Sequence, residues 1–170
     1  LEMFHATREL ASSSGLVAYE ISNHARPNEQ CSHNLNYWRN GEYVGIGPGA
    51  VSKVEHTRSG NPRSISPYLR RIQGHGHATE WSETPGEVAR VAECWWLGLR
   101  LQGGVDPAEV ARTAGASDAA IEVSVTLATR LVGDGLLERS EARYTLSEQG
   151  LPLADAVARE FLQRLPQGVD

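Results

Sequence analysis

The sequence has 170 residues, of which 40% are hydrophobic and 22% charged, which is typical of a globular chain with one domain or a small domain joined to part of a larger one. Its formal net charge of −5 excludes a global basic field that would attract nucleic acid or an anionic membrane. No apolar run reaches the ~20 residues that span a bilayer, and the start lacks the apolar core of a signal peptide, so we expect a cytoplasmic protein.

The first 15 residues are predicted to form a helix. Phe4 and Leu10 share one face of it, and the small residues 13–15 end it. Because the chain starts with leucine and its single methionine is Met3, we expect the sequence to be part of a longer protein.

Residues 16–58 are rich in glycine, aromatic residues and histidine, and their pattern predicts two strands, 16–21 and 43–46, separated by a long loop. Helix, strand, loop and strand indicate the last α/β units of a barrel whose earlier strands are missing. Two strands alone bury too little surface to be stable. We therefore expect this region to be incomplete, exchanged between chains through exposed strands as a homodimer, or packed on a missing N-terminal barrel.

The loop between these strands contains the string His33-Asn34-Leu35-Asn36-Tyr37-Trp38. Imidazole, carboxamide, phenol and indole groups can stack on a flat ring and form hydrogen bonds with its substituents. The competing interpretation is that the aromatic side chains anchor the loop to a core, which is their commoner role.

A glycine-rich segment, 45–50 (GIGPGA), follows the second predicted strand. Glycines at the carboxyl end of a barrel strand allow the backbone to approach a ligand closely. The segment lacks the spacing of a phosphate-binding or dinucleotide-binding loop, and a tight turn without a ligand explains the glycines equally well.

His24, Cys31 and His33 lie close together in the sequence, but their spacing matches no zinc-binding frame, and we predict no metal site. Ligation of haem iron by one histidine stays open, because a single axial histidine is sufficient. With only two cysteines, the chain also has too few for a disulfide framework.

Residues 59–83 are expected to be a connector with a short helix at 67–72, and residues 84–165 carry clear helix signals. Three helices are predicted to begin at Thr84, Asp106 and Ser117, each with a capping residue. Strands 136–139 and 143–146 and a last helix after Ser147 complete the layout of a winged-helix domain. The last helix contains Pro152 near its start, so it begins later or kinks there.

A winged-helix layout raises DNA binding as an alternative function. The third helix would read DNA, yet it carries Asp118, Glu122 and a single basic residue, Arg130. Such a face neutralises few phosphates, so nucleic acid is not an expected partner.

Three ordered segments resemble the oxygen-independent coproporphyrinogen III oxidase-like family of radical-SAM proteins. The second is typical of the family's haem-chaperone branch, and two further segments resemble its C-terminal domain. The segments are 19–27 (YEISNHARP), 33–39 (HNLNYWR), 45–50, 96–101 (WLGLRL) and 134–137 (DGLL).

The resemblance implies an α+β fold in which the end of an incomplete radical-SAM (β/α) barrel, residues 1–58, is followed by the connector and by a mainly helical winged-helix-like domain, residues 84–170. The family holds a [4Fe-4S] cluster on a Cys-x3-Cys-x2-Cys motif, which this sequence lacks. The chain alone is therefore expected to bind no cofactor, to have no catalytic residue and to be inactive, while the full-length family uses the cluster, S-adenosylmethionine and haem.

By the same resemblance, the haem or porphyrin side comprises His33, Asn34, Tyr37 and Trp38, with His24 as a further candidate, and the S-adenosylmethionine side comprises Asn36, Gly47, Gly49, Ala50 and Val51. The expected function is haem binding and transfer to haem-accepting proteins. The alternatives are part of an oxidase that decarboxylates coproporphyrinogen III, and a module, residues 84–165, that docks a partner protein.

Overall fold

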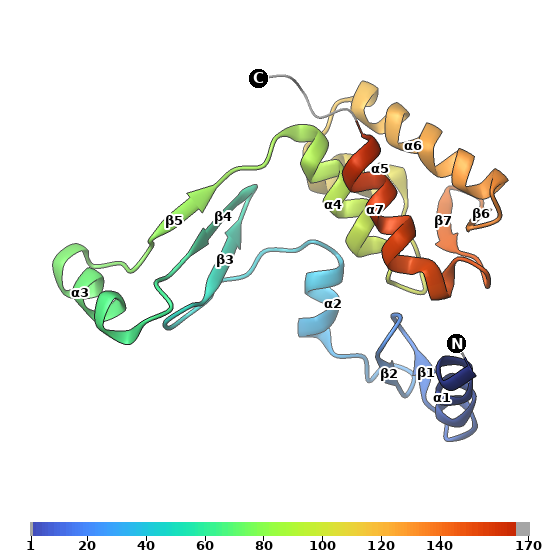
Figure 1. The fold of residues 1–170 in the computed structure, drawn as a ribbon, viewed down its shortest axis with the longest axis horizontal. Coiled ribbons are helices and arrows are strands. Elements are labelled where there is room, and N and C mark those ends of the chain that lie inside the picture. Colours follow the sequence, from blue (N-terminus) through green and yellow to red (C-terminus); the bar gives the residue numbers. More distant parts are fainter. Residues whose placement is uncertain (1, 166–170) are drawn as a thin grey trace. The chain divides into compact units, whose positions relative to one another are not determined.

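The computed structural model describes residues 2–165, apart from the side chain of residue 164 (Figure 1). The contacts divide the chain into two compact units. The first unit combines the residues up to Asn40 with those from Glu87 onward, and the second unit is Gly41–Gly86. The boundaries of these units, at residues 40 and 87, differ from the predicted domain boundaries at residues 58 and 83. The predicted boundaries concern the domains of the family and remain a prediction.

The first unit begins with the predicted helix. Gly15 ends this helix with a φ of 75°, a left-handed conformation that glycine adopts without strain. The predicted strand 16–21 is reduced to two residues, which pair in antiparallel register with His24 and Ala25. The elements are α1 (Glu2–Ser13), β1 (Val17–Ala18), β2 (His24–Ala25) and α2 (Ser32–Trp38).

Helix α2 corrects the prediction of a long loop between two strands. The amide of Leu35 donates to the carbonyl of Cys31 at 2.9 Å, and the amide of Arg39 donates to that of Leu35 at 2.9 Å. The helix is only seven residues long and has no side-chain cap at its N-terminus. Polar and aromatic residues in so short a segment give no apolar periodicity, which is why the helix was not predicted.

The rest of the first unit has the predicted order of three helices, a hairpin and a last helix. Pro152 lies in a short 3-10 helix, η1, so the last α-helix begins after it, as one of the two predicted outcomes requires. That this arrangement of helices and hairpin is a winged-helix-like fold remains a prediction. The elements are α4 (Glu87–Gly98), α5 (Pro107–Ala114), α6 (Asp118–Gly133), β6 (Leu137–Ser140), β7 (Arg143–Leu146), η1 (Leu151–Leu153) and α7 (Ala154–Arg164).

Two of the predicted helix caps are confirmed. A carboxylate oxygen of Asp106 accepts from the amide of Ala108 at 2.8 Å, and the hydroxyl of Ser117 accepts from the amide of Ala120 at 3.4 Å. The cap predicted at Thr84 is wrong, because α4 starts at Glu87 itself.

The core of the first unit lies between α4, the hairpin and α7. The rings of Trp95 and Phe161 stack with centroids 4.8 Å apart, and Tyr144 meets Trp95 edge-on at 5.4 Å. These three side chains are at most 1% exposed. Burial of large aromatic side chains contributes much of the stability of a small domain, so this cluster holds the helices together.

Residues 16–40 are tied to the helical part by polar contacts. Glu20 and Leu101 form an isolated antiparallel bridge, and the amide of Gln102 donates to the carbonyl of Tyr19 at 3.1 Å. The side-chain amide of Asn40 donates to the sulfur of Cys94 at 3.3 Å.

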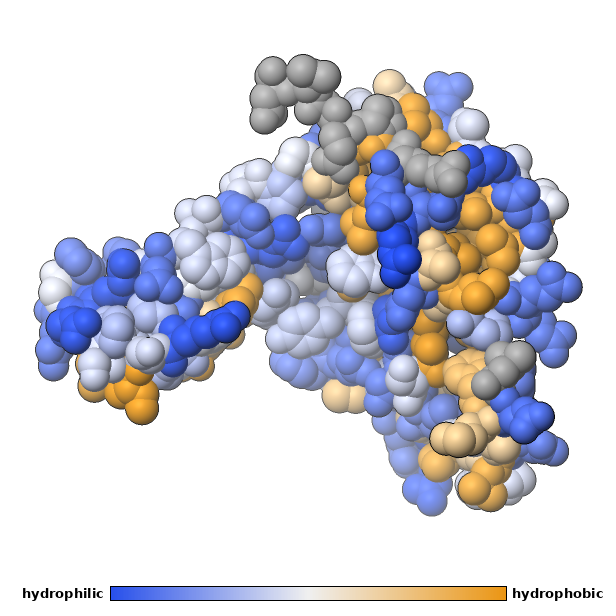
Figure 2. Space-filling model, viewed as in Figure 1, coloured by the Kyte–Doolittle hydropathy of each residue, from blue (hydrophilic) through white to orange (hydrophobic). Residues whose placement is uncertain are grey.

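The second unit is a three-stranded antiparallel sheet in the order β3-β4-β5, with one helix between β4 and β5. The helix, α3, exposes the apolar side chains Ile65, Leu69 and Ile72. Other apolar side chains of this unit are exposed as well, namely Val44, Ile46, Val54 and Trp81. The face of this unit seen in Figure 2 is nevertheless mostly hydrophilic. The elements are β3 (Val51–Val54), β4 (Thr57–Gly60), α3 (Ile65–His75) and β5 (Trp81–Glu83).

The strand predicted at 43–46 is wrong. Within that segment only Tyr43 pairs, through an isolated bridge to Lys53, and the glycine-rich segment precedes a strand instead of following one. A Cβ atom on Gly45 would lie 2.2 Å from the carbonyl oxygen of Val51, so this position requires glycine for close approach of the backbone. Residues 59–83, expected to be a connector, hold the end of β4 together with α3 and β5.

Among the residues that the structure describes, none of the helices combines the length and the apolar character that crossing a membrane requires.

Candidate functional site

The first candidate site is helix α2, which arranges the polar-aromatic string on different faces. His33 and Tyr37 are four residues apart, so they lie on the same face of the helix. Their ring centroids are 4.9 Å apart and their planes nearly perpendicular, at 88°. Both side chains are exposed. The pair therefore presents an imidazole and a phenol together to the solvent.

Asn34 faces a different neighbour. Its side-chain amide donates to the phenolic oxygen of Tyr19 at 3.1 Å. This bond links α2 to the segment that precedes β2. Four predicted haem-side residues thus share one helix, whereas His24 lies in β2, and Asn34 has a local structural partner.

Trp38 is packed under a guanidinium group. The central carbon of Arg100 lies 4.5 Å from the centroid of the Trp38 ring, the geometry of a cation–π contact. Arg100 also lies 3.6 Å from a carboxylate oxygen of Glu20, and the Glu20 side chain is fully buried. The indole is therefore fixed against the end of α4.

The buried Glu20 carboxylate organises this region. One of its oxygens accepts from the amide of Ser22 and from the side chain of Asn23, both at 2.7 Å. The other oxygen faces Arg100. Hydrogen bonds to a carboxylate are stronger than neutral ones, and a buried charge is tolerated when it is paired in this way.

The sequence pattern did not predict this ion pair of Glu20 and Arg100, although both residues lie in the family-like segments. A carboxylate in a largely apolar strand pattern was the signal that could have singled out Glu20. Its partner, Arg100, is 80 positions further along the chain, and the local pattern does not identify such a partner.

Nε2 of His24 and Nε1 of Trp38 are among the buried nitrogen atoms that have no hydrogen-bond partner within residues 2–165, as is Nε1 of Trp95 in the aromatic core. An unsatisfied buried donor or acceptor costs about 1–3 kcal/mol. A ligand that supplied a partner would remove that cost.

The residues present do not fit an iron–sulfur cluster. Cys31 is exposed and Cys94 is buried beside Asn40. No group of three or more His, Cys, Asp or Glu side chains within the described residues is arranged to hold a metal ion. No step through a cluster is therefore derived for this chain.

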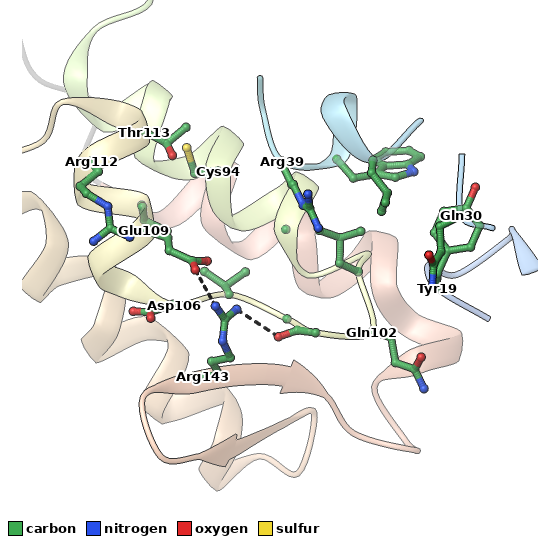
Figure 3. Close-up of a pocket in the computed structure, with 18 residues that line it drawn as sticks. Tyr19, Gln30, Arg39, Cys94, Gln102, Asp106, Glu109, Arg112, Thr113 and Arg143 are labelled. Carbon is green, nitrogen blue, oxygen red and sulfur yellow. Dashed lines mark hydrogen bonds and ion pairs between the residues drawn. The ribbon is translucent and has the colours of Figure 1, made fainter. Parts of the chain in front are cut away.

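A cavity of about 680 Å³ lies in the first unit beside α2 (Figure 3). Its walls come from α2 and the preceding loop, the end of α4 with the segment that follows it, α5, and the start of β7. Trp38 lines this cavity, whereas His33, Asn34 and Tyr37 do not. The predicted haem-side residues are therefore divided between an exposed face and a cavity wall.

The predicted S-adenosylmethionine-side residues belong to both units. Asn36 is in α2, and the glycine-rich segment is in the second unit. Gly47 and Gly49 have positive φ values of 103° and 73°, and a Cβ atom on Gly47 would meet no other atom within 4 Å. This backbone can approach a ligand closely.

The glycine-rich segment is held by several hydrogen bonds, two of which join it to Asn61 and Pro62. The amide of Gly49 donates to the carbonyl of Pro62 at 2.8 Å, and the side chain of Asn61 donates to the carbonyl of Gly47 at 3.0 Å. A second cavity, of about 350 Å³, is lined by Gly49 and Val51 together with residues from the start of α3 and from β5. Ala50 lies between these two lining residues. The binding role of the segment remains a prediction.

No family model matches the chain. It is 35% identical to the haem chaperone HemW of Synechocystis sp. over 113 residues, which are 64% of this chain and 27% of the relative. It is 31% identical to HemW of Bacillus subtilis over 164 residues, which are 96% of this chain and 43% of the relative. The chain thus spans less than half the length of these curated relatives.

The fold is similar to part of a solved structure. The coproporphyrinogen III oxidase HemN from Escherichia coli, a radical-SAM enzyme, matches 95% of this chain with 40% of its own chain, at a TM-score of 0.70 and 16% sequence identity. This likeness supports a mixed fold of helices and sheets such as that enzyme contains. The sequence relatives identify the chain as a HemW-like radical-SAM protein.

Proposed function

We propose that this chain is the C-terminal portion of a radical-SAM haem chaperone, which binds haem at α2 and transfers it to acceptor proteins. The observation that carries the proposal is the folding of the family-like string into α2, with the His33 and Tyr37 rings paired on an exposed face. The similarity to proteins named HemW supports haem as the ligand.

The chemistry of the exposed pair suits haem. An imidazole nitrogen of His33 can act as an axial ligand of the iron. The neighbouring ring of Tyr37 offers an aromatic edge to the porphyrin plane. The network of Glu20 and Arg100 beneath Trp38 keeps α2 in place while its outer face remains accessible.

The rest of the chain is proposed to complete the surroundings of this ligand. In the proposal, residues 1–58 form the end of an incomplete barrel, and residues 84–170 form a winged-helix-like domain. Asn36, Gly47, Gly49, Ala50 and Val51 would contribute to the side that holds S-adenosylmethionine. S-adenosylmethionine, when bound beside an iron–sulfur cluster, would supply the radical chemistry. This chain would contribute backbone that approaches the S-adenosylmethionine.

A haemin titration followed by the Soret band tests the proposal. We expect a saturable shift with the chain, and we expect His33→Ala to weaken haemin binding at least about tenfold, because the axial ligand is lost. His77→Ala, an exposed histidine in the second unit, is the matched control and should bind as the unaltered chain does. Equal haemin affinities of His33→Ala and the control would show that His33 of α2 does not bind the haem iron.

His24→Ala separates the two histidine candidates. If His24 is the ligand, this variant loses the Soret shift and His33→Ala retains it. Loss in His33→Ala alone assigns the iron to the exposed face of α2.

A further inference from the structure

The cavity beside α2 lies on the side of the helix away from the His33–Tyr37 pair. Its wall includes Leu35, Trp38 and Arg39, which follow one another at helical spacing on that side. Its volume of about 680 Å³ is within the range of roughly 300–1,000 Å³ that small-molecule sites occupy. The cavity is thus a separate candidate site.

The acidic side chains that line the cavity are engaged by other groups. Asp106 caps α5 by accepting from the amide of Ala108 at 2.8 Å. Glu109 forms an ion pair with Arg143, which also donates to the carbonyl of Gly103 at 3.3 Å (Figure 3). The Glu109 carboxylate neutralises Arg143, whereas Asp106 keeps its negative charge while it caps α5.

Two other arginines line the same cavity, so its three arginines outnumber its two carboxylates by one. The guanidinium groups of Arg39 and Arg112 form no ion pair or hydrogen bond with any described residue, and Figure 3 shows both side chains among those that line the cavity. Tyr19, a further lining residue, accepts a hydrogen bond from Asn34 and so keeps its own hydroxyl proton to donate. The cavity therefore has several uncommitted donors and an excess of positive charge.

This inventory indicates the chemistry of a ligand. A guanidinium group binds a carboxylate through two parallel hydrogen bonds, a geometry that a lysine or a neutral donor does not provide. Two such groups on the wall of one cavity suit a molecule with at least two carboxylates. The glutamine side chains of Gln30 and Gln102, which also line it, can donate to the same oxygens.

We propose that this cavity binds an organic polycarboxylate, with one carboxylate at Arg39 and another at Arg112. The site does not depend on His33 or on iron, so it goes beyond haem binding at the exposed face. A small polycarboxylic acid and the carboxylate arms of a tetrapyrrole share the required chemistry.

Two probes distinguish these sources, namely citrate and coproporphyrin III, which carries four carboxylates and no iron. Isothermal titration of the chain with each probe should show saturable binding of at least one. Arg39→Gln and Arg112→Gln should each weaken that binding at least about tenfold, because a charge-assisted pair is lost. Both side chains are exposed, so neither substitution should alter the melting temperature of the chain.

Arg159→Gln is the matched control, because Arg159 is an exposed arginine of the same unit and does not line the cavity. This variant should bind both probes as the unaltered chain does. Citrate binding that depends on the two arginines identifies a site for a small polycarboxylate, and binding of coproporphyrin III alone identifies a subsite for tetrapyrrole carboxylates. Absence of saturable binding of both probes, or equal affinity in Arg39→Gln, Arg112→Gln and the control, overturns the proposal. Since citrate needs no iron ligand, its binding is independent of the outcome of the haemin titration.

Discussion

The two parts of the first unit are held together by different physical means. Residues 87–165 surround a closed aromatic core, whereas among residues 2–40 only Ala18 and Glu20 are buried. The helical part is stabilised by removal of apolar surface from water, which has no preferred direction. The N-terminal part depends on a directed polar network around one carboxylate. The comparison shows why the candidate site lies in residues 2–40. There the polar network fixes the side chains in position without burying them in a core.

The largest expected effect concerns the helical part. Trp95→Ala removes a fully buried indole that stacks on Phe161, so the free energy of unfolding should fall by about 3–5 kcal/mol. Urea denaturation followed by circular dichroism measures this loss. The neighbouring Trp96 is 39% exposed, and Trp96→Ala is the control with a much smaller effect. Similar losses for both variants would show that the stacked cluster is not the core of this unit.

A smaller and more local effect is expected in the N-terminal part. Glu20→Gln keeps the shape of the side chain but removes the charge that faces Arg100, and the resulting loss should be about 2 kcal/mol. The amide of Gln102, which donates to Tyr19, should then exchange its hydrogen faster, while amides of α4 keep their protection.

Glu29→Gln provides the control for this prediction. The side chain of Glu29 is 63% exposed and lies 3.8 Å from Arg26, and such surface pairs contribute little. Hydrogen exchange should therefore remain unaltered at the amide of Gln102. Faster hydrogen exchange throughout α4 in Glu20→Gln would contradict this prediction. It would mean that residues 2–40 and residues 87–165 unfold together and are not stabilised independently.

The same contrast explains what could be predicted from the sequence. Asp106 and Ser117 cap the helices that follow them through contacts at most three residues away, and local signals of this kind predict both caps correctly, although the same kind of signal at Thr84 is wrong. The ion pair between Glu20 and Arg100 and the cavity beside α2 join segments far apart in the chain, which no local pattern reports.

The errors in the second unit have a local cause. Residues 43–46 alternate as a strand does, but Gly45 has to accommodate the backbone of Val51 at close range, and the chain turns before the ladder can continue. The true strands, β3 and β4, are four residues each and carry mostly polar side chains, so their hydrophobic pattern is weak.

Long-range polar contacts also occur within the helical part, and Glu87 shows how one can be detected. The backbone amide of Ser117, and then its hydroxyl, form hydrogen bonds to the Glu87 carboxylate and hold the pKa of this group below its ordinary value of 4.5. A lowered pKa in the folded state means that the ionised form stabilises the fold. This contribution is fully present above the ordinary pKa and is lost as the pH falls through the lower, folded value.

Glu87→Gln should therefore differ most from the unaltered chain near neutral pH, and the difference should shrink as the pH falls below about 4.5. Thermal unfolding from pH 7 to pH 3 measures it. The Glu87 side chain is only partly buried, so solvent screens its charge and this is the smallest effect of the three. Glu138→Gln, at an exposed position on β6, is the control and should show no such convergence. A difference that stays constant across this range would mean that the Glu87 amide replaces the carboxylate fully, and that the contact between α4 and the start of α6 depends on shape and not on charge.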